Sequence, residues 1–283
     1  MKSLAQAILQ VPPATLRIVG GLAGSEEIQA QLAKGGIVTR PGKFSSQALV
    51  VELGSVHASS ILREGGALLQ DEASQLVASL VAPHAGDRVL DLCAAPGIKT
   101  SQLATALGEG ILVACDLSAR RLRTMQTLLP KSIPLGVPVL SVRLDAGQPL
   151  CFGIQFDRVL LDAPCSGTGT LARNPEIKWR LQTKDIFRLA ELQAKMLHNA
   201  LQALAPGGRL VYATCSLEPE ENERVVEEVL RRNQGFQLAK RSELAAQFPM
   251  CAPLFDSQGY FHTRPDLHGM DGFFAALIHR MPS

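Results

Sequence analysis

The chain has 283 residues, 46% of them apolar, and a formal net charge of +2. This composition can fill the core of one large domain with a small addition, and it excludes a disordered chain. No apolar run approaches the roughly 20 residues of a membrane span, and the first residues lack a signal-peptide pattern, so we expect a soluble, cytoplasmic protein. The net charge alone does not indicate a nucleic-acid binder; the local cluster of Arg120, Arg121 and Arg123 is either a phosphate contact or a solvated helix face.

Six cysteines are the first chemically informative residues. None forms a Cys-x-x-Cys pair or has a histidine at metal-ligand spacing, so we expect no bound metal. A chain with this much core does not need a disulfide framework, and we expect free thiols. The six are Cys93, Cys115, Cys151, Cys165, Cys215 and Cys251.

Residues 1–75 carry a short pattern of their own. "TLRIV" from Thr15 and "ALVVEL" from Ala48 have the composition of strands, and residues 25–34 between them have an amphipathic helical pattern. This order predicts one βαβ unit in a small N-terminal α+β subdomain.

Residues 76–283 are predicted to form the main domain. From Arg88 onward, buried strands alternate with helices, which is typical of a doubly wound parallel α/β sheet. "GFFAALIHR" near the end predicts a last, antiparallel edge strand, after a loop at 245–269. The other expected strands are "RVLDLC", "GILVACD", "VPVLSVRLDA", "FDRVLLDAPC" and "GGRLVYATC", and helices are expected to begin near Lys99, Ser118, Lys184 and Pro219.

The loops that follow these strands are where ligands bind in open α/β sheets. The small-residue turn ending at Gly97 allows a close backbone approach and leaves amide groups free at a helix start. Asp116 ends the next strand 19 residues later, near the interval at which an acidic side chain reaches a ribose hydroxyl. Asp145 ends the third strand, where it either meets an adenine edge or caps a turn.

The same turn indicates which nucleotide is bound. A dinucleotide-binding fold would carry G-x-G-x-x-G here, and that pattern is absent. A nucleoside without phosphates fits better, and S-adenosylmethionine is the common one. The spacing therefore predicts a methyltransferase.

Three motifs carry a specific resemblance. "DLCAAPGIKT", "DAPCSGTGTLARNPEIKW" and "YATCSLEPEENE" together resemble the RNA cytosine-5 methyltransferases, which include bacterial small-subunit ribosomal RNA enzymes and the Nop/Sun proteins. "QDEASQLVA" and "DGFFAALIHR" extend the similarity over residues 15–280. The resemblance implies a Rossmann-like sheet that uses S-adenosylmethionine, an RNA substrate (ribosomal before transfer RNA), and an N-terminal subdomain similar to the family's small RNA-binding unit.

Methylation of cytosine at carbon 5 has definite chemical requirements. A thiolate must add to carbon 6, because carbon 5 is otherwise too weak a nucleophile. A carboxyl group should face N3, for which Asp162 at a strand end is suited, and a second group must assist loss of the carbon 5 proton. The resemblance assigns Cys215 as nucleophile, Cys165 as the group that assists proton removal and product release, and Lys99 as a neighbour of the target base.

One position departs from the family's usual motif: Ile98 stands where a glycine is common. Because a β-branched residue tolerates positive φ poorly, either Ile98 has an ordinary backbone conformation or cofactor binding is impaired, and we expect the first. The expected cofactor-binding residues are Cys93, Ala94, Ala95, Pro96, Gly97, Ile98, Lys99, Asp116, Asp145 and Asp162.

Residues 166–183 form a connection long enough to suggest a function. Its side chains suit RNA phosphates and a stacked base, although Trp179 is equally compatible with a core position. The target base must be single-stranded or flipped to be reached. The side chains concerned are Arg173, Asn174, Lys178, Trp179 and Arg180.

Two other functions remain open. A methyltransferase for another nucleobase atom would more naturally carry Asn-Pro-Pro-Tyr or Asp-Pro-Pro-Tyr where this chain has "DAPC", and it would not need Cys215. A non-catalytic RNA-binding or ribosome-assembly protein of the same fold is conceivable because of Ile98. Such a scaffold need not bind S-adenosylmethionine, so a cofactor-binding measurement separates it from an enzyme.

Overall fold

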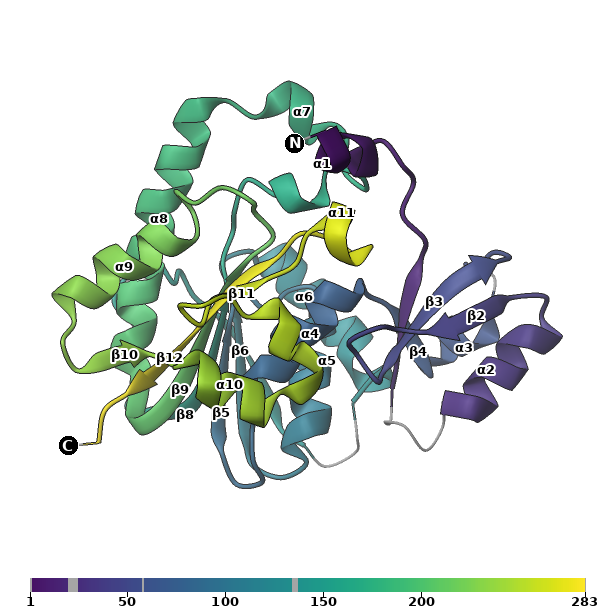
Figure 1. Cartoon of the computed structure of the whole chain (residues 1–283). Helices are drawn as coiled ribbons and strands as arrows, with labels where there is room; N and C mark the ends of the chain where they lie inside the picture. The colour runs from purple at the N-terminus through teal and green to yellow at the C-terminus, as the bar shows by residue number, and fades with distance from the viewer. Residues whose placement is uncertain (1, 20–24, 58, 134–136, 283) are drawn as a thin grey trace.

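The computed structural model describes residues 2–19, 25–57, 59–133 and 137–282. Two sheets organise this part of the chain (Figure 1). The first, in the order β2-β3-β1-β4, belongs to the N-terminal segment, and the second has the order β10-β12-β9-β8-β5-β6-β7, with β11 paired to β12. None of the helices in these ranges is long and apolar enough to cross a bilayer.

The N-terminal sheet corrects the predicted βαβ unit. Strands β1 and β3 pair antiparallel, with Thr15 opposite Val50, and β3 also pairs antiparallel with β2. The strand that follows helix α2 is therefore β2, which runs in the direction of β1 with β3 inserted between them; the sequence pattern had overlooked β2. The elements are α1 (Lys2–Ile8), β1 (Thr15–Ile18), α2 (Ser25–Lys34), β2 (Val38–Pro41), β3 (Ala48–Leu53), α3 (Ser60–Glu64) and β4 (Ala67–Leu69).

The large sheet confirms the doubly wound prediction. Its five central strands are parallel, and β5 lies between β6 and β8. The chain therefore adds β6 and β7 on one side of β5 and then β8 and β9 on the other. The topological switch point, where ligands bind in such folds, therefore lies between β5 and β8. The strands are β5 (Arg88–Leu92), β6 (Ile111–Asp116), β7 (Val139–Arg143), β8 (Phe156–Asp162), β9 (Leu204–Thr214), β10 (Phe236–Leu238), β11 (Phe261–His262) and β12 (Phe274–Arg280).

The last strand is antiparallel, as predicted, but it does not lie at the edge. β12 pairs with β9 on one side and with the short strand β10 on the other. Three residues are too few to give a periodic signal, which is why β10 escaped prediction. The predicted loop at 245–269 also contains structure, namely η4 (Pro249–Leu254), β11 and α11 (Pro265–His268).

Helices cover both faces of the large sheet (Figure 1). Alternate residues of β9 serve the two faces: Leu210 and Tyr212 pack on the side of α8 and α9, and Val211 packs on the side of α4. The carboxyl ends of the strands are thereby fixed from both sides. The remaining helices are α4 (Glu72–Val81), α5 (Ile98–Leu107), α6 (Ala119–Leu128), η2 (Leu129–Lys131), η3 (Thr168–Thr170), α7 (Ile177–Arg180), α8 (Thr183–Ala203), α9 (Glu223–Arg232) and α10 (Arg241–Gln247).

Helix α9 begins at Glu223 and not, as predicted, at Pro219. Residues 219–222 form a turn in which the Pro219 carbonyl accepts hydrogen bonds from the Asn222 and Arg224 amides. The side chains of Glu221 and Asn222 are buried beside β9. This turn takes the place of the first helical turn that was predicted from Pro219.

Candidate active site

A cavity of about 880 Å³ opens at the carboxyl ends of β5, β6, β8 and β9. Its volume is in the range of cofactor and small-molecule sites. Strands β1 and β4, the start of α4 and the segment before β12 contribute the opposite wall. Among the lining residues are Cys93, Asp116, Asp145, Asp162, Cys165 and Cys215, all of which the sequence had indicated.

The turn after β5 forms a backbone cradle at one end of the cavity. Gly97 has a φ of 101°, and a Cβ there would lie 2.6 Å from the Met125 Cγ, so both conformation and space require glycine. Cys93 also has a positive φ, of 65°, and the next amide, of Ala94, donates to the Cys115 carbonyl over 2.7 Å. Of the seven predicted loop residues, six line the cavity, and Gly97 is not among the lining residues.

Ile98 is the first residue of α5. Among the described residues other than glycine, positive φ occurs at Ala82 and Cys93 and not at Ile98. The expected ordinary backbone at Ile98 is confirmed, because the left-handed position of the turn belongs to Gly97. The isoleucine therefore does not distort the cradle.

Arg17 of β1 links the N-terminal sheet to the start of α5. Its fully buried guanidinium donates to the Ser101 Oγ over 2.5 Å, to the Ile98 carbonyl over 3.4 Å and to the Gln70 Oε1 over 2.7 Å. Burial lowers the pKa of Arg17 to about 10. Sequence reasoning missed this contact; its one signal was a charged residue inside the otherwise apolar "TLRI".

Asp116 lies at the end of β6, as predicted, with its carboxylate buried against the cradle. Its oxygens accept hydrogen bonds from the Ser118 amide (2.9 Å) and the Ala95 amide (3.3 Å), and they pair with Arg121 Nη1 at 3.2 Å. A carboxylate has about four acceptor positions, so these contacts leave one free. Two ribose hydroxyls can therefore bind Asp116 only if the Arg121 side chain, 55% exposed, moves aside.

The contacts of Arg121 show what one residue of the basic cluster on α6 does. Its guanidinium donates to the Ala95 carbonyl as well as pairing with Asp116, so it contacts the cradle although more than half of the side chain remains exposed. The sequence had offered only a phosphate contact or a solvated face for this residue.

Asp145 is exposed at the rim of the cavity. Its Oδ1 accepts the Gly147 amide over 2.9 Å, which is the turn-capping alternative that the sequence had left open. Leu144, Ala146 and Leu117 line the cavity beside it. Together they give this part of the rim an apolar wall with one carboxylate.

Lys99 and Asp162 meet at the switch point. Lys99 Nζ donates to Asp162 Oδ2 over 2.8 Å, and it lies 5.3 Å from the centroid of the Phe273 ring. Burial favours the neutral amine, but attraction and hydrogen bonding to Asp162, followed by a charge on Cys215, outweigh it and raise the pKa of Lys99. A lysine side chain only 14% exposed thus keeps its charge at the centre of the cavity.

Asp91, one residue before the end of β5, is a second acid at the switch point. Burial raises its pKa to about 7, against the opposing effect of a 2.6 Å hydrogen bond from the Thr100 hydroxyl. Near neutral pH it therefore exists in both protonation states beside the cradle. The quoted motif contained Asp91, but nothing in its spacing distinguished it from an ordinary strand residue.

Cys165 and Cys215 face each other across the ends of β8 and β9. Their Sγ atoms are 3.3 Å apart, and both residues are partly buried free thiols. Hydrogen bonding to Cys215, then burial, then charges on Cys215, Glu221 and Asp162 raise the pKa of Cys165 well above its ordinary value. The Cys165 thiol therefore holds its proton more tightly than an ordinary cysteine.

A buried carboxyl group joins the two cysteine turns. Glu221 is fully buried; its Oε1 accepts the Ser166 amide and the Gln193 side-chain amide, each at 2.9 Å. Its Oε2 accepts the Ser166 hydroxyl and, over 2.6 Å, the Ser216 hydroxyl. Ser166 and Ser216, the residues that follow the two cysteines, are therefore bound to the same carboxyl group. In the sequence, Glu221 is one of several acidic residues in "EPEENE", and nothing in the motif distinguishes it from the others.

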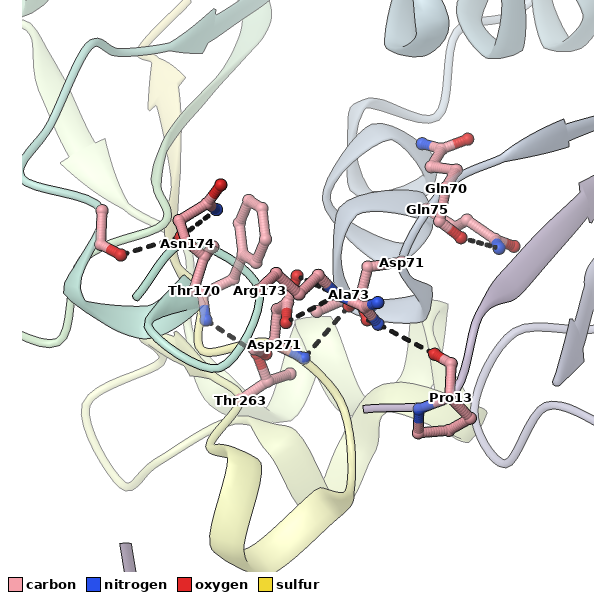
Figure 2. Close-up of polar contacts among 12 residues, drawn as sticks. Pro13, Gln70, Asp71, Ala73, Gln75, Thr170, Arg173, Asn174, Thr263 and Asp271 are labelled. Atoms are coloured by element: carbon pink, nitrogen blue, oxygen red, sulfur yellow. Dashed lines mark hydrogen bonds and ion pairs between the residues drawn. The ribbon is translucent and has the colours of Figure 1, made fainter. Parts of the chain in front are cut away.

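Arg173 ties the loop after Cys165 to two other parts of the chain (Figure 2). Its Nε lies 3.1 Å from both oxygens of Asp271, and its Nη2 donates to Asp71 Oδ2 over 3.0 Å and to the Pro13 carbonyl over 3.1 Å. Burial and then the neighbouring Asp71 raise the pKa of Asp271 to about 7, despite Arg173. Arg173 is thus satisfied within the protein.

The other predicted RNA contacts divide into two groups. Asn174 donates to the Thr170 hydroxyl over 3.0 Å, so it closes its own turn. Lys178, Trp179 and Arg180 of α7 are exposed. The core interpretation of Trp179 is wrong, because 88% of its surface is exposed.

The sheet order, the glycine cradle and the acid after β6 define a Rossmann-like domain of the S-adenosylmethionine-dependent methyltransferase type. Residues 78–279 match the family described as 16S rRNA methyltransferase RsmB/F, and the chain belongs to this family. The cofactor of this class is S-adenosylmethionine, as the sequence predicted.

Individual relatives agree with this assignment. The ribosomal RNA small subunit methyltransferase B of Vibrio cholerae is 39% identical over 253 residues, covering 89% of this chain and 55% of the relative. That of Proteus mirabilis is 34% identical over 280 residues, covering 99% of this chain and 62% of the relative. The chain therefore spans somewhat more than half the length of these relatives.

Solved structures share the fold. NSun6 from Pyrococcus horikoshii with SFG has a TM-score of 0.85 at 21% identity, covering 100% of this chain and 94% of that one. A methyltransferase homologue from the same organism has a TM-score of 0.76 at 27% identity, covering 99% and 90%. The likeness includes the N-terminal sheet as well as the large one.

Proposed function

We propose that the protein methylates carbon 5 of a cytosine in RNA through a covalent adduct with Cys215. The observation that carries the proposal is the pair of strand-end thiols, with sulfur atoms 3.3 Å apart, in the wall of the cavity that contains the cofactor cradle. Methylation of a ring nitrogen or an exocyclic amine does not need a thiol. Addition to carbon 6 of a pyrimidine needs one, in thiolate form.

In the first step, the Cys215 thiol loses its proton and its sulfur forms a bond to carbon 6. The electrons of the carbon 5–carbon 6 double bond shift through carbon 4 toward N3, and the Asp162 carboxylate takes up the thiol proton and passes it to N3. Asp162 is the residue we assign to the N3 edge. Lys99 holds the Asp162 carboxyl group in place over 2.8 Å, and its ammonium attracts negative charge at Cys215. Carbon 5 is then nucleophilic enough to accept a methyl group.

In the second step, the carbon 5 proton leaves, the carbon 6–sulfur bond breaks with its electron pair on sulfur, and N3 returns its proton to Asp162, which restores the ring double bond. We assign assistance of this step to Cys165. The hydrogen bond to Cys215 is the largest cause of the raised pKa of Cys165, and a charge on Cys215 raises this pKa further. Both diminish once the Cys215 sulfur is bound to carbon, so formation of the adduct lowers the pKa of Cys165 and lets it lose its own proton to solvent. The Cys165 thiolate can then accept the carbon 5 proton.

The donor set of the cavity fits S-adenosylmethionine. The cradle from Cys93 to Ile98 would hold the amino acid part, Asp116 the ribose, and the wall of Leu117 and Asp145 the adenine. When bound, S-adenosylmethionine supplies an electrophilic methyl group on a positively charged sulfur. Lys99 would lie close to this group as well as to the base, which makes the Asp162 carboxylate beside it necessary for charge balance.

The RNA substrate is supported by the family and by the chain's organisation. We assign residues 1–75 to an RNA-binding subdomain and residues 76–283 to the catalytic domain, with Arg17 and Arg173 fixing one against the other. The family's description favours small-subunit ribosomal RNA over transfer RNA. Cytosines in single-stranded or flipped positions are the accessible targets.

Product analysis tests this function. The protein is incubated with labelled S-adenosylmethionine and small-subunit ribosomal RNA from cells that lack the gene, and the RNA is digested to nucleosides. The expected product is 5-methylcytidine, and Cys215→Ala should abolish it while calorimetry shows unchanged cofactor binding. Label in any other nucleoside, or activity retained in Cys215→Ala, would overturn the proposal; absence of cofactor binding would favour the non-catalytic scaffold.

A further inference from the structure

The most exposed aromatic side chain of the described residues lies on the loop that follows Cys165. Trp179, the only tryptophan in the sequence, is 88% exposed on the short helix α7. A tryptophan buries a large area when it finds a partner and is enriched where it contacts other molecules. The proposed mechanism does not use this side chain.

The position of Trp179 is fixed by the residue two places before it. Ile177 is 4% exposed, and its Cδ1 would lie 3.0 Å from a Cβ at Gly167, which is two residues from Cys165. The Ile177 carbonyl accepts the Leu181 amide over 3.0 Å, which closes the helical turn. Helix α7 is therefore anchored on the cysteine turn by one face, while Trp179 extends from the other.

The charge around Trp179 indicates the kind of partner. Lys178 and Arg180 flank it, and both are exposed. Between residues 176 and 188, four basic side chains stand against two acidic ones, so this stretch alone carries a net charge equal to the +2 of the whole chain. An apolar ring between two cations matches a nucleobase and its adjoining phosphates, whereas an apolar protein surface would leave both cations unpaired.

We propose that Trp179 is a stacking platform for a nucleotide that neighbours the target cytosine, with Lys178 and Arg180 binding phosphates on either side of it. The inference rests on the proposed function, because it takes single-stranded RNA as the ligand. Its consequence is that a flanking base, held outside the cavity, orients the strand while the cytosine enters it. Stacking tolerates any base, so this contact adds affinity with little sequence preference.

The single tryptophan makes the contact directly observable. The full chain is titrated with a short single-stranded RNA that has one central cytosine, and with matched RNAs carrying an abasic residue at each flanking position in turn. We expect quenching of tryptophan emission by the complete RNA, and loss of that quenching with one particular abasic RNA. Trp179→Ala should weaken RNA binding about 5- to 150-fold, the equivalent of ~1–3 kcal/mol per stacked base, and Trp179→Phe should restore most of it.

Phe187→Ala provides the matched control, since Phe187 is an exposed aromatic residue on α8, 54% accessible and further along the same basic stretch. It should bind RNA like the parent. Unchanged emission on RNA binding, or equal affinities of Trp179→Ala and the parent, would overturn the inference while 5-methylcytidine formation continued to support the enzyme. Loss of affinity in Trp179→Ala without any methylcytidine from the parent would instead support the platform and overturn the proposed function.

Discussion

Glu221 gives the sharpest structural prediction, because one buried carboxyl group holds the turns of both cysteines. Its Oε1 is bound by two groups that can only donate, the Ser166 amide and the Gln193 side-chain amide. Its Oε2 is bound by two hydroxyls, of Ser166 and Ser216. Hydroxyls can also accept, so the two oxygens respond differently to substitution.

The magnitudes follow from this difference. In Glu221→Gln, the amide oxygen can remain at the Oε1 position, and the amide nitrogen can donate to the hydroxyls. All four contacts survive without charge assistance, so we expect a loss of about 1–2 kcal/mol in the free energy of unfolding. Glu221→Ala leaves two buried donors unpaired at ~1–3 kcal/mol each, and we expect a loss of about 3–5 kcal/mol.

Urea unfolding and methyl transfer are measured on the same variants. Misalignment of the cysteine turns should lower the turnover of Glu221→Ala by about 10- to 100-fold with little change in cofactor affinity. Glu220→Gln is the control, because Glu220 makes only a surface pair with Arg224. If Glu221→Ala matched Glu220→Gln in both stability and turnover, Glu221 would not hold the two cysteine turns in place.

Three further predictions concern the cofactor side and the loop after Cys165. Asp116→Ala should weaken S-adenosylmethionine binding, measured by calorimetry, by more than about fivefold. Arg121→Met should bind the cofactor at least as tightly as the parent. Weaker binding by Arg121→Met would show that Arg121 does not need to move aside. Asp91 has a folded-state pKa of about 7 against an ordinary 3.8, so it disfavours the folded state progressively as pH rises between these values. Asp91→Asn should therefore remove a loss of stability of up to ~1.4 kcal/mol per pH unit in that window. If the free energies of unfolding of the two proteins, measured in urea, changed in parallel with pH, the prediction would be wrong. Arg173→Ala leaves Asp71 and the buried Asp271 without their cation, and we expect destabilisation by about 2–4 kcal/mol. Thermal unfolding checks it against Arg188→Ala, which removes an exposed side chain of α8.

The large sheet was predictable from sequence because its central strands, such as β5, β6 and β9, are buried on both faces and read as short apolar runs between helical patterns. Because parallel strands bring their carboxyl ends to one edge of the sheet, the sequence also predicted that Asp116, Asp162 and Cys215 lie at that edge. Strands β8 and β9 are neighbours in the sheet, and this brings Cys165 and Cys215 together.

What escaped prediction was decided by tertiary contacts. Glu221 reads as a helix-start acid, and only the folded chain shows that it turns inward to two distant serines. Arg173 was expected to contact RNA, and Arg17 was not noticed, yet both donate hydrogen bonds to other segments of the protein. Short strands such as β10 carry too few residues for any period to appear.

The covalent step is the central claim, and a denaturing gel tests it most directly. Cys165→Ala, incubated with substrate RNA and S-adenosylmethionine, should accumulate a protein–RNA band that survives denaturation, because attack by Cys215 proceeds while release is slowed. The band should be absent from the Cys165→Ala, Cys215→Ala double variant. If Cys165→Ala gave no such band under conditions in which the parent methylates the RNA, the division of labour between the two cysteines would be wrong.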